Sequence, residues 1–340
     1  MLKPFIQKLV DRKNLTKQES SEAMSLIMQG QASPSQMASF LTALRMKGET
    51  VAEITGFAEE MRSHAEKIHP ASAHLVDTCG TGGDVSHTFN ISTVSAFVAA
   101  GAGITIAKHG NRSVSSKCGS ADLLEALGVK IDMEPKKVEE CINKIGFGFI
   151  FAPTFHKAMK FVAPSRKEMG IRTVFNILGP LTNPANAHAQ VLGVFDEKLT
   201  ETMAEVLKNL GISEAFVVHG MDGLDEISIS DRTKVSHLKN DDVKTYFIKP
   251  EDYRLKRGKK EELIVHNVEE GKLLAESILK GGGVGPKKDV VLFNAAAAIV
   301  VGGAARDILE GIKIAASSID SGRAYKKLQE LIEFTKGQLE

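Results

Sequence analysis

The sequence contains no tryptophan, only three tyrosines, and three cysteines that are scattered without a CxxC spacing. An odd number of scattered cysteines argues against a disulfide framework and favours a reducing compartment. The N-terminal MLKPFIQKLVDRKN has no apolar core of signal-peptide length. No segment approaches the roughly 20 apolar residues of a membrane span. We therefore expect a cytoplasmic protein that does not contact a membrane.

An excess of positive charge is also missing, because Lys+Arg number 43 and Asp+Glu 42, which leaves a formal charge of +1. A surface for nucleic acid normally needs a basic excess, so nucleic acid is not expected as a partner. The remaining composition, with 43% hydrophobic residues, is that of an ordinary globular protein. At 340 residues the chain is long for one core, which predicts a large domain and a smaller one.

The first part of the chain reads as helices only. Leu, Met, Phe and Ala recur at three- and four-residue spacing in segments that begin after Thr16, Ser33 and Thr50. We predict a helical domain over residues 1–72, joined by helices around 156–185, and an α/β domain over 73–340. So small a helical unit must bury its apolar stripes against another surface, either the larger domain or a second copy of the chain.

From Leu75 onward, short apolar runs alternate with helical patterns. The runs HLVD, ITIAKHG, FGFIF, AQVLGVF and EAFVVHG read as strands, and KVSHLK with VKTYFI reads as an antiparallel excursion at a sheet edge. Strands that alternate with helices favour a mainly parallel sheet covered on both faces. The predicted fold class is therefore α/β, with a central sheet flanked by helices and a small all-helical N-terminal domain.

The stretch DTCGTGGDVSHTFNIST, residues 77–93, follows the first strand and leads into a helix. Its glycines allow a ligand to approach the backbone closely, and its hydroxyls and the N–H groups of the helix N-terminus suit phosphate oxygens. The stretch has neither the GKS of a Walker A loop nor a GxGxxG pattern. A tight strand-to-helix turn with N-caps is the structural alternative.

A second phosphate-like stretch, KHGNRSVSSKCGSADLLEALG, spans residues 108–128 after the next strand. Its cations Lys108, Arg112 and Lys117 flank several serines. Ligands of parallel sheets bind beyond the carboxyl ends of the strands, so two such loops predict one ligand with two phosphate positions. A solvated charged loop is the alternative.

Two further stretches complete the candidate site. GMDGLDEISIS, residues 220–230, presents Asp225 and Glu226, which could hold Mg²⁺ together with substrate phosphates, although such a pair by itself is more often a solvated loop. PSRKEMGIRTVFNILGPLTNP, residues 164–184, carries arginines that could clamp a carboxylate beside the Gly179-Pro180 corner. His156 lies upstream and could join them, although either residue type is as often a structural hydrogen-bonder.

Taken together, these stretches resemble the anthranilate phosphoribosyltransferase family. The motifs GTGGD, FNIST, KHGNR, SADLLEALG, FNILGPLTNP, DGLDEIS and the late NAAAAIVV occur in the family's order along essentially the whole chain. Pyrimidine nucleoside phosphorylases share the fold but are less similar in the HGNR and DGLDE segments. The resemblance implies transfer of the phosphoribosyl group of phosphoribosyl pyrophosphate (PRPP) to the amine of anthranilate, in tryptophan biosynthesis, by a homodimer joined through its helical domains.

The resemblance also implies the site residues. Those for PRPP are Gly80, Gly83, Asp84, Thr88, Asn90, Ile91, Ser92, Thr93, Lys108, Asn111, Arg112, Ser113, Ser115, Ser116 and Ser120. Those for anthranilate are Gly80, His109, Asn111, His156, Arg166 and Gly179, and those for two Mg²⁺ ions per subunit are Ser92, Asp225 and Glu226. No covalent nucleophile or general base is implied, because an aromatic amine is already neutral at pH 7.

Two other functions stay open from the sequence. A nucleoside phosphorylase would use phosphate and a nucleoside. A non-catalytic descendant that binds nucleotide or nucleic acid would have lost the acidic pair and gained basic surface, whereas Asp225 and Glu226 are present and the net charge is +1.

Overall fold

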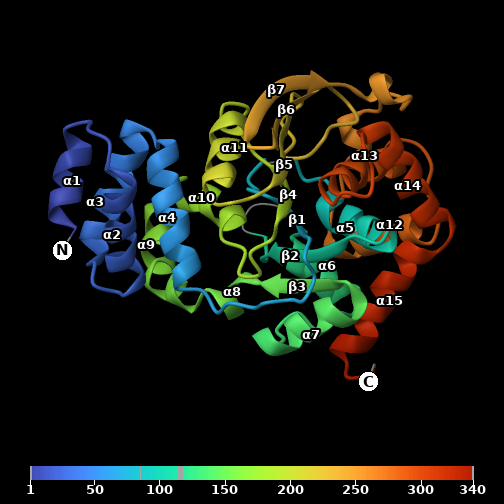
Figure 1. Ribbon diagram of the computed structural model, residues 1–340, viewed down its shortest axis with the longest axis horizontal. Helices are drawn as coiled ribbons and strands as arrows, with labels where there is room; N and C mark the ends of the chain where they lie inside the picture. The colour runs from blue at the N-terminus through green and yellow to red at the C-terminus, as the bar shows by residue number, and fades with distance from the viewer. Residues whose placement is uncertain (1, 85, 114–117, 339–340) are drawn as a thin grey trace.

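A central sheet separates two groups of helices in the computed structural model, which describes residues 2–84, 86–113 and 118–338 (Figure 1). Its seven strands are β1 Leu75–Gly80, β2 Thr105–Gly110, β3 Phe147–Phe151, β4 Ala189–Gly193, β5 Glu214–Gly220, β6 Thr233–Lys239 and β7 Asp242–Ile248. The strand order is β3-β2-β1-β4-β5-β6-β7. The first five strands in this order are parallel, and β6 and β7 are added antiparallel. The predicted mainly parallel sheet with an antiparallel edge is confirmed.

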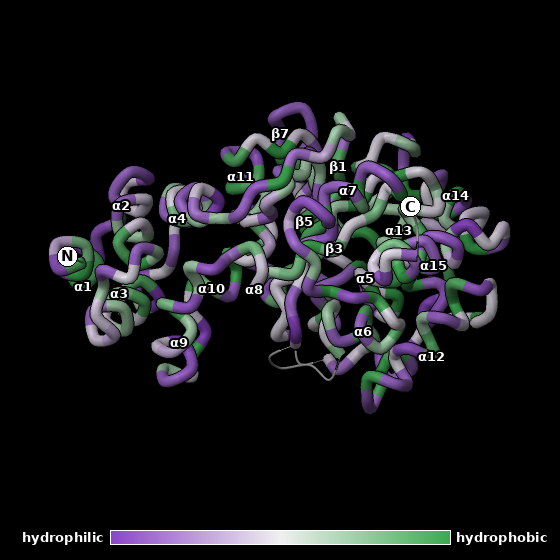
Figure 2. Tube along the Cα trace, turned by 90° about the horizontal axis from the view of Figure 1, so that it is seen from below, coloured by the Kyte–Doolittle hydropathy of each residue, from purple (hydrophilic) through white to green (hydrophobic). Residues whose placement is uncertain are grey.

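Four helices form the N-terminal unit: α1 Lys3–Val10, α2 Lys17–Met28, α3 Pro34–Lys47 and α4 Val51–Ser63. The last three start where the sequence predicts, because Thr16, Ser33 and Thr50 each cap the helix that follows in a capping box. Figure 2 shows this unit at one end of the elongated molecule, opposite α12, α14 and α15.

The remaining helices connect and cover the strands. They are α5 Ile91–Gly101, α6 Ser120–Ala126, α7 Pro135–Ile145, α8 Ala152–Phe155, η1 Lys157–Phe161, α9 Ala163–Met169, α10 Phe175–Leu178, η2 Gly179–Leu181, α11 Leu199–Asn209, η3 Pro250–Tyr253, η4 Lys260–Leu263, α12 Val268–Leu279, α13 Pro286–Val301, α14 Ile308–Asp320 and α15 Arg323–Thr335. None of the helices in the described residues combines the length and apolar character that crossing a bilayer requires.

Both faces of the sheet are buried, as strand β5 illustrates. Phe216 and Val218 join the apolar cluster formed with α5, α13, α14 and α15, whereas Ala215 and Val217 join a second cluster on the other face. Successive side chains of a strand point to opposite faces, so this division follows from the alternation. The second cluster includes α11 and continues into α1–α4.

The segment after β3 contacts the N-terminal helical unit. Helix α9 packs on α3, η1 on α2, and α10 on α4. The Arg62 side chain of α4 also donates to the carbonyl of Leu181 at 2.7 Å. The division of the chain at residue 72, with residues 156–185 joined to the helical part, remains our proposal for its domains.

Candidate active site

The glycine-rich loop begins where β1 ends. Gly82 and Gly83 have φ of +65° and +76°, which L side chains rarely adopt, so the turn requires glycine. Gly80 is required for space, because an added Cβ would lie 2.5 Å from Oδ2 of Asp225. The Gly82 N–H donates to that same oxygen at 2.8 Å. The loop therefore packs against residues 220–230, the acidic segment, in which Asp225 lies 143 residues after Gly82.

Helix α5 points its N-terminus at the same place. Asn90 caps it by accepting from the Thr93 N–H at 3.1 Å, and the Ser92 N–H donates to Oε1 of Glu226 at 3.1 Å. The Ile91 side chain is buried in the core, so only its backbone faces the loop. The helix N-terminus favours negative charge, here that of Glu226.

Lys108, near the end of β2, places its buried ammonium group at the N-terminus of α5. Its Nζ donates to the Thr78 carbonyl and, at 3.2 Å, to Oγ of Ser92. Burial lowers the pKa of Lys108, an effect that Asp77 opposes by its negative charge. Asp77 accepts from the His109 N–H at 3.1 Å and from Asn183 at 2.9 Å, and burial raises its pKa to about 6. This network fixes the KHGN segment to the strand beside it.

His109 and His156 form a buried pair whose ring centroids are 5.1 Å apart. Nδ1 of His109 lies 3.2 Å from the carbonyl of Gly179, which can only accept, so this nitrogen carries the proton. Burial lowers the pKa of His109 well below its ordinary value and that of His156 to about 4. Within the described residues, neither Nε2 has a hydrogen-bond partner. The neutral pair therefore leaves two buried ring nitrogens for a ligand.

We expect the contribution of His156 to the free energy of unfolding to fall as the pH drops from about 6.5 to 4, because His156 binds a proton in the unfolded chain but not in the folded one. The raised pKa values of Asp77 and Asp225 act in the opposite direction over this range, so the difference between wild type and His156→Gln isolates the histidine. The loss attributable to His156 is at most about 3 kcal/mol. Urea unfolding at pH 7, 5.5 and 4.5 would measure it, with His156→Gln as the comparison. The same pH dependence in His156→Gln as in wild type would contradict the assignment.

Arg166 and Arg172 lie on either side of KEMGI in the sequence, but their side chains contact different parts of the molecule. Arg166, on α9, is half-buried over the ring of Phe175 at 5.5 Å, and burial lowers its pKa. It has no acidic partner within residues 2–84, 86–113 and 118–338. Arg172 instead donates to the Gly83 carbonyl and stacks on Phe195 at 4.4 Å. Of these two arginines, Arg166 is the one whose guanidinium is not bonded to another described residue, which makes it the candidate for a substrate carboxylate.

The second phosphate-like loop is described only in part. Arg112 forms ion pairs with Asp122 and Glu125 of α6, at 3.2 Å to the first, so its guanidinium is held at the helix surface. Oγ of Ser120 donates to the Asn111 carbonyl at 3.1 Å, and the Ser113 N–H donates to Asp122 at 3.0 Å. Ser115, Ser116 and Lys117 lie outside the described residues.

The acidic segment is held in a defined shape. The Asp222 carboxylate accepts from the Ser228 hydroxyl at 2.6 Å and from that of Ser230, and Lys260 donates to the Asp222 carbonyl at 2.7 Å. Gly193, at the end of β4, allows the approach, since an added Cβ would lie 1.5 Å from the carbonyl oxygen of Asp225.

The residues present fit a divalent cation. Burial raises the pKa of Asp225 to about 7 and that of Glu226 well above its ordinary value, with repulsion from Asp84 adding to both. A cation would relieve this repulsion. Within the described chain, no group of three or more His, Cys, Asp or Glu side chains could hold a metal by itself. Substrate oxygens would have to complete the coordination, as is usual for Mg²⁺ bound with phosphates.

Three residues of the site escaped the sequence analysis: Gly193, which admits Asp225; Lys260, which holds the acidic segment; and Asn294, whose side chain contacts Ile227. The glycine at the end of AQVLG and the asparagine that precedes an alanine run were available signals. However, the sequence around Gly193 does not indicate that it contacts Asp225, and the sequence around Asn294 does not indicate that it contacts Ile227.

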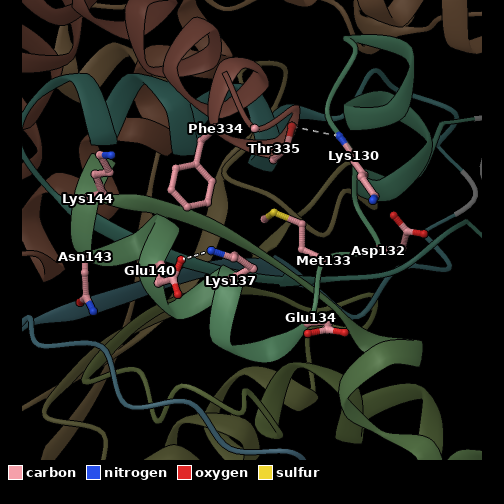
Figure 3. A pocket seen from close by; sticks show the side chains of 11 residues that line it. Lys130, Asp132, Met133, Glu134, Lys137, Glu140, Asn143, Lys144, Phe334 and Thr335 are labelled. Atoms are coloured by element: carbon pink, nitrogen blue, oxygen red, sulfur yellow. Dashed lines mark hydrogen bonds and ion pairs between the residues drawn. The ribbon is translucent and has the colours of Figure 1, made fainter. Parts of the chain in front are cut away.

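A cavity outside these loops lies between α7 and the end of α15 (Figure 3). It has a volume of about 900 Å³, and Met133, Lys137 and Phe334 line it. None of its lining residues belongs to the four predicted loops, and Lys137 is paired with Glu140 at 2.6 Å. It is not part of the candidate site.

Comparison with known proteins agrees with the arrangement of fold and loops. Residues 3–65 match the family model "Glycosyl transferase family, helical bundle domain", and residues 72–325 match "Glycosyl transferase family, a/b domain". The anthranilate phosphoribosyltransferase of Acetivibrio thermocellus is 57% identical over 98% of this chain and 97% of its own length.

Two solved structures are similar throughout. Anthranilate phosphoribosyltransferase from Thermus thermophilus has a TM-score of 0.93 and 42% identity, covering 97% of this chain and 99% of its own. The enzyme from Saccharomyces cerevisiae, solved in complex with PRPP and Mg, has a TM-score of 0.91 and 29% identity, covering 99% of this chain and 98% of its own. With four loops meeting at the strand ends and relatives matched over nearly its whole length, this chain belongs to the anthranilate phosphoribosyltransferase family.

Proposed function

We propose that the loops at the carboxyl ends of β1, β2 and β5, together with the segment between β3 and β4, carry the family's reaction in this chain. That reaction transfers the phosphoribosyl group of PRPP to the amine of anthranilate, giving N-(5-phosphoribosyl)anthranilate and pyrophosphate in tryptophan biosynthesis. The observation that carries the proposal is the contact between the glycine loop and the acidic segment, through Gly82 to Asp225 at 2.8 Å and Ser92 to Glu226 at 3.1 Å. A phosphate-binding backbone and a candidate metal site thus adjoin each other.

PRPP would bind over the glycine loop and the N-terminus of α5. N–H groups of the loop and the helix other than those of Gly82 and Ser92, which donate to Asp225 and Glu226, would be donors for pyrophosphate oxygens. Lys108 would add a buried positive charge. The proposed contacts are Gly80, Gly83, Asp84, Thr88, Asn90, Ile91, Ser92, Thr93, Lys108, Asn111, Arg112, Ser113, Ser115, Ser116 and Ser120. Arg112 would have to leave its ion pairs with α6 to reach a phosphate.

Asp225 and Glu226, with the hydroxyl of Ser92, would hold Mg²⁺, and we propose two ions per subunit. The yeast relative has been solved with PRPP and Mg, which supports a metal but not the number of ions. Bound there, Mg²⁺ would neutralise negative charge on the pyrophosphate that leaves.

Anthranilate would lie between α9 and the end of β2. Arg166 would pair with its carboxylate, since a guanidinium matches that group with two parallel hydrogen bonds. The Nε2 of His109, which carries no proton, would accept an N–H group and so orient the amine, and the unpartnered Nε2 of His156 would lie nearby. Gly80, Asn111 and Gly179 would complete this pocket.

Positioning and charge stabilisation would account for catalysis, because the amine of anthranilate is a neutral nucleophile that needs no activating base. No covalent nucleophile is needed at the ribose. The nearby thiols are unsuited to that role, since burial raises the pKa of Cys79 well above its ordinary value and that of Cys118 to about 11.

Replacing Arg166 by alanine should weaken the apparent affinity for anthranilate roughly ten- to a hundred-fold, the loss expected for one charge-assisted hydrogen bond. Affinity for PRPP should hardly change, because the phosphate loops are untouched. Arg166→Lys should rescue only part of the loss, since it offers a point charge and not a fork. Steady-state kinetics that vary each substrate separately would test this. If Arg166→Ala weakens PRPP and spares anthranilate, the arginine serves the other substrate.

We also propose a homodimer formed through the N-terminal helices. Val10 of α1 and Met46 of α3 are 61% and 72% exposed and line one shallow groove with Leu9 and Ala43. Exposed apolar side chains that lie together mark interaction surfaces. The three cysteines are unpaired and buried, which supports a reducing compartment, and we propose the cytoplasm.

Light scattering at micromolar concentration should give the mass of a dimer. Val10→Glu combined with Met46→Glu should shift it to the monomer, because two charges would be buried in the interface. Leu273→Glu, a matched change at a 59% exposed leucine of α12, should leave the dimer intact. A monomeric wild-type protein would refute the proposal.

A further inference from the structure

Asn294 is a buried polar side chain in the apolar middle of α13. It is 3% exposed, and it is the only polar residue between Val290 and Val301. A buried amide is costly unless its hydrogen bonds are made. Nothing in the proposed chemistry uses this residue, although the NAAAAIVV motif starts with it.

The amide of Asn294 is engaged by the backbone of the acidic segment. Its Oδ1 accepts from the Ile227 N–H at 2.9 Å, and its Nδ2 donates to the Ile227 carbonyl at 2.9 Å. Nδ2 also donates to the carbonyl of Val290, one helical turn earlier, at 2.9 Å. Both amide hydrogens are used, so the orientation of the side chain is fixed by its partners.

Ile227 directly follows Glu226, so Asn294 holds the chain on one side of the acidic pair. On the other side, the carbonyl of Asp225 lies against Gly193. The two carboxylates are therefore held between a strand end of the sheet and a helix that covers it. A small movement of Ile227 would shift Glu226 away from the Ser92 N–H, 3.1 Å from its Oε1.

We propose that Asn294 is a positioning residue that sets the place of Glu226 for metal binding. The inference rests on the proposed role of Asp225 and Glu226. Groups behind metal ligands orient them, and their loss typically lowers metal affinity or activity about ten- to a hundred-fold. A purely structural Asn294 would contribute to stability and leave the magnesium dependence unchanged.

The test is the magnesium dependence of Asn294→Ala and of Asn294→Asp. The first removes all three hydrogen bonds, and the second keeps the shape but places an oxygen against the carbonyls of Ile227 and Val290. We expect the half-saturating Mg²⁺ concentration to rise about tenfold or more. Calorimetric titration of Mg²⁺ with pyrophosphate present should show the same loss, and the apparent affinity for anthranilate should stay within about twofold of wild type, since Arg166 is untouched.

Ser318→Ala is the matched control. Its hydroxyl is fully buried and donates to the Val98 carbonyl at 2.8 Å, away from the acidic segment. Its loss should lower the melting temperature and leave the Mg²⁺ dependence as in wild type. An equal change of Mg²⁺ dependence in Ser318→Ala, or wild-type dependence in both Asn294 variants, would overturn the proposal.

Two further outcomes are decisive. If neither Asn294 variant folds, the residue is a determinant of folding and the positioning role is overturned. If Asp225→Asn with Glu226→Gln also keeps the wild-type Mg²⁺ dependence, the proposed metal site itself has failed. If that double variant loses Mg²⁺ binding while the Asn294 variants keep it, only the role of Asn294 is wrong.

Discussion

Asp225→Asn combined with Glu226→Gln is expected to lower turnover by about a hundredfold or more while the protein stays folded. The amides keep the shape of the carboxylates, and their oxygens can still accept from the Gly82 and Ser92 N–H groups. What is lost is the negative charge that would hold Mg²⁺ on the pyrophosphate. Because burial and repulsion already raise the pKa of both acids, removing their charge should not destabilise the fold.

The measurement is turnover as a function of Mg²⁺, with thermal unfolding to establish that the variant is folded. Glu269→Gln with Glu270→Gln, another adjacent acidic pair in the first turn of α12, is the matched control and should keep wild-type turnover. If the double variant of Asp225 and Glu226 keeps near wild-type rates at limiting Mg²⁺, these two acids do not hold the metal.

Gly193→Ala should have a comparably large effect, although the change adds one methyl group and no charge. The new Cβ would lie 1.5 Å from the Asp225 carbonyl oxygen and 2.4 Å from its carbon. Two atoms that are not bonded cannot approach each other this closely, so the acidic segment would have to move away from the end of β4. We expect turnover to fall about a hundredfold or more, because misplacement by about 1 Å can cost that much.

Gly101→Ala separates this effect from general damage. An added Cβ there would also meet backbone, at 2.6 Å from the Ala324 nitrogen, but at the C-terminal end of α5 and away from its N-terminus. Its main effect should be a lower melting temperature, with only a small effect on turnover per folded molecule. If Gly193→Ala keeps wild-type kinetics and Mg²⁺ dependence, Asp225 does not need its observed position.

The sequence predicts local structure well where a single motif determines it. A glycine turn after a strand, followed by an Asn cap, determines both the loop and the start of α5, so these residues could be placed without coordinates. The same is true of the antiparallel pair β6 and β7, whose alternating short runs lie next to each other in the chain. The family resemblance rests on such local stretches and is confirmed by the comparisons.

Contacts between distant segments could not be predicted in this way. Nothing near Arg112 in the loop indicates that Glu125 of α6 would hold its guanidinium, and nothing near Gly193 indicates Asp225. The neutral state of His109 depends on burial beside His156, 47 positions later, and on the Gly179 carbonyl. Such properties arise from packing, which a single sequence does not specify position by position.

The most direct test of the whole account is product formation by the purified protein from anthranilate and PRPP, with and without Mg²⁺. Phosphate with a pyrimidine nucleoside serves as the competing substrate pair. We predict N-(5-phosphoribosyl)anthranilate and pyrophosphate in equal amounts, only with Mg²⁺, and no cleavage of the nucleoside. Cleavage of the nucleoside by phosphate, or no transfer to anthranilate at saturating Mg²⁺, would contradict the function assigned to these strand-end loops.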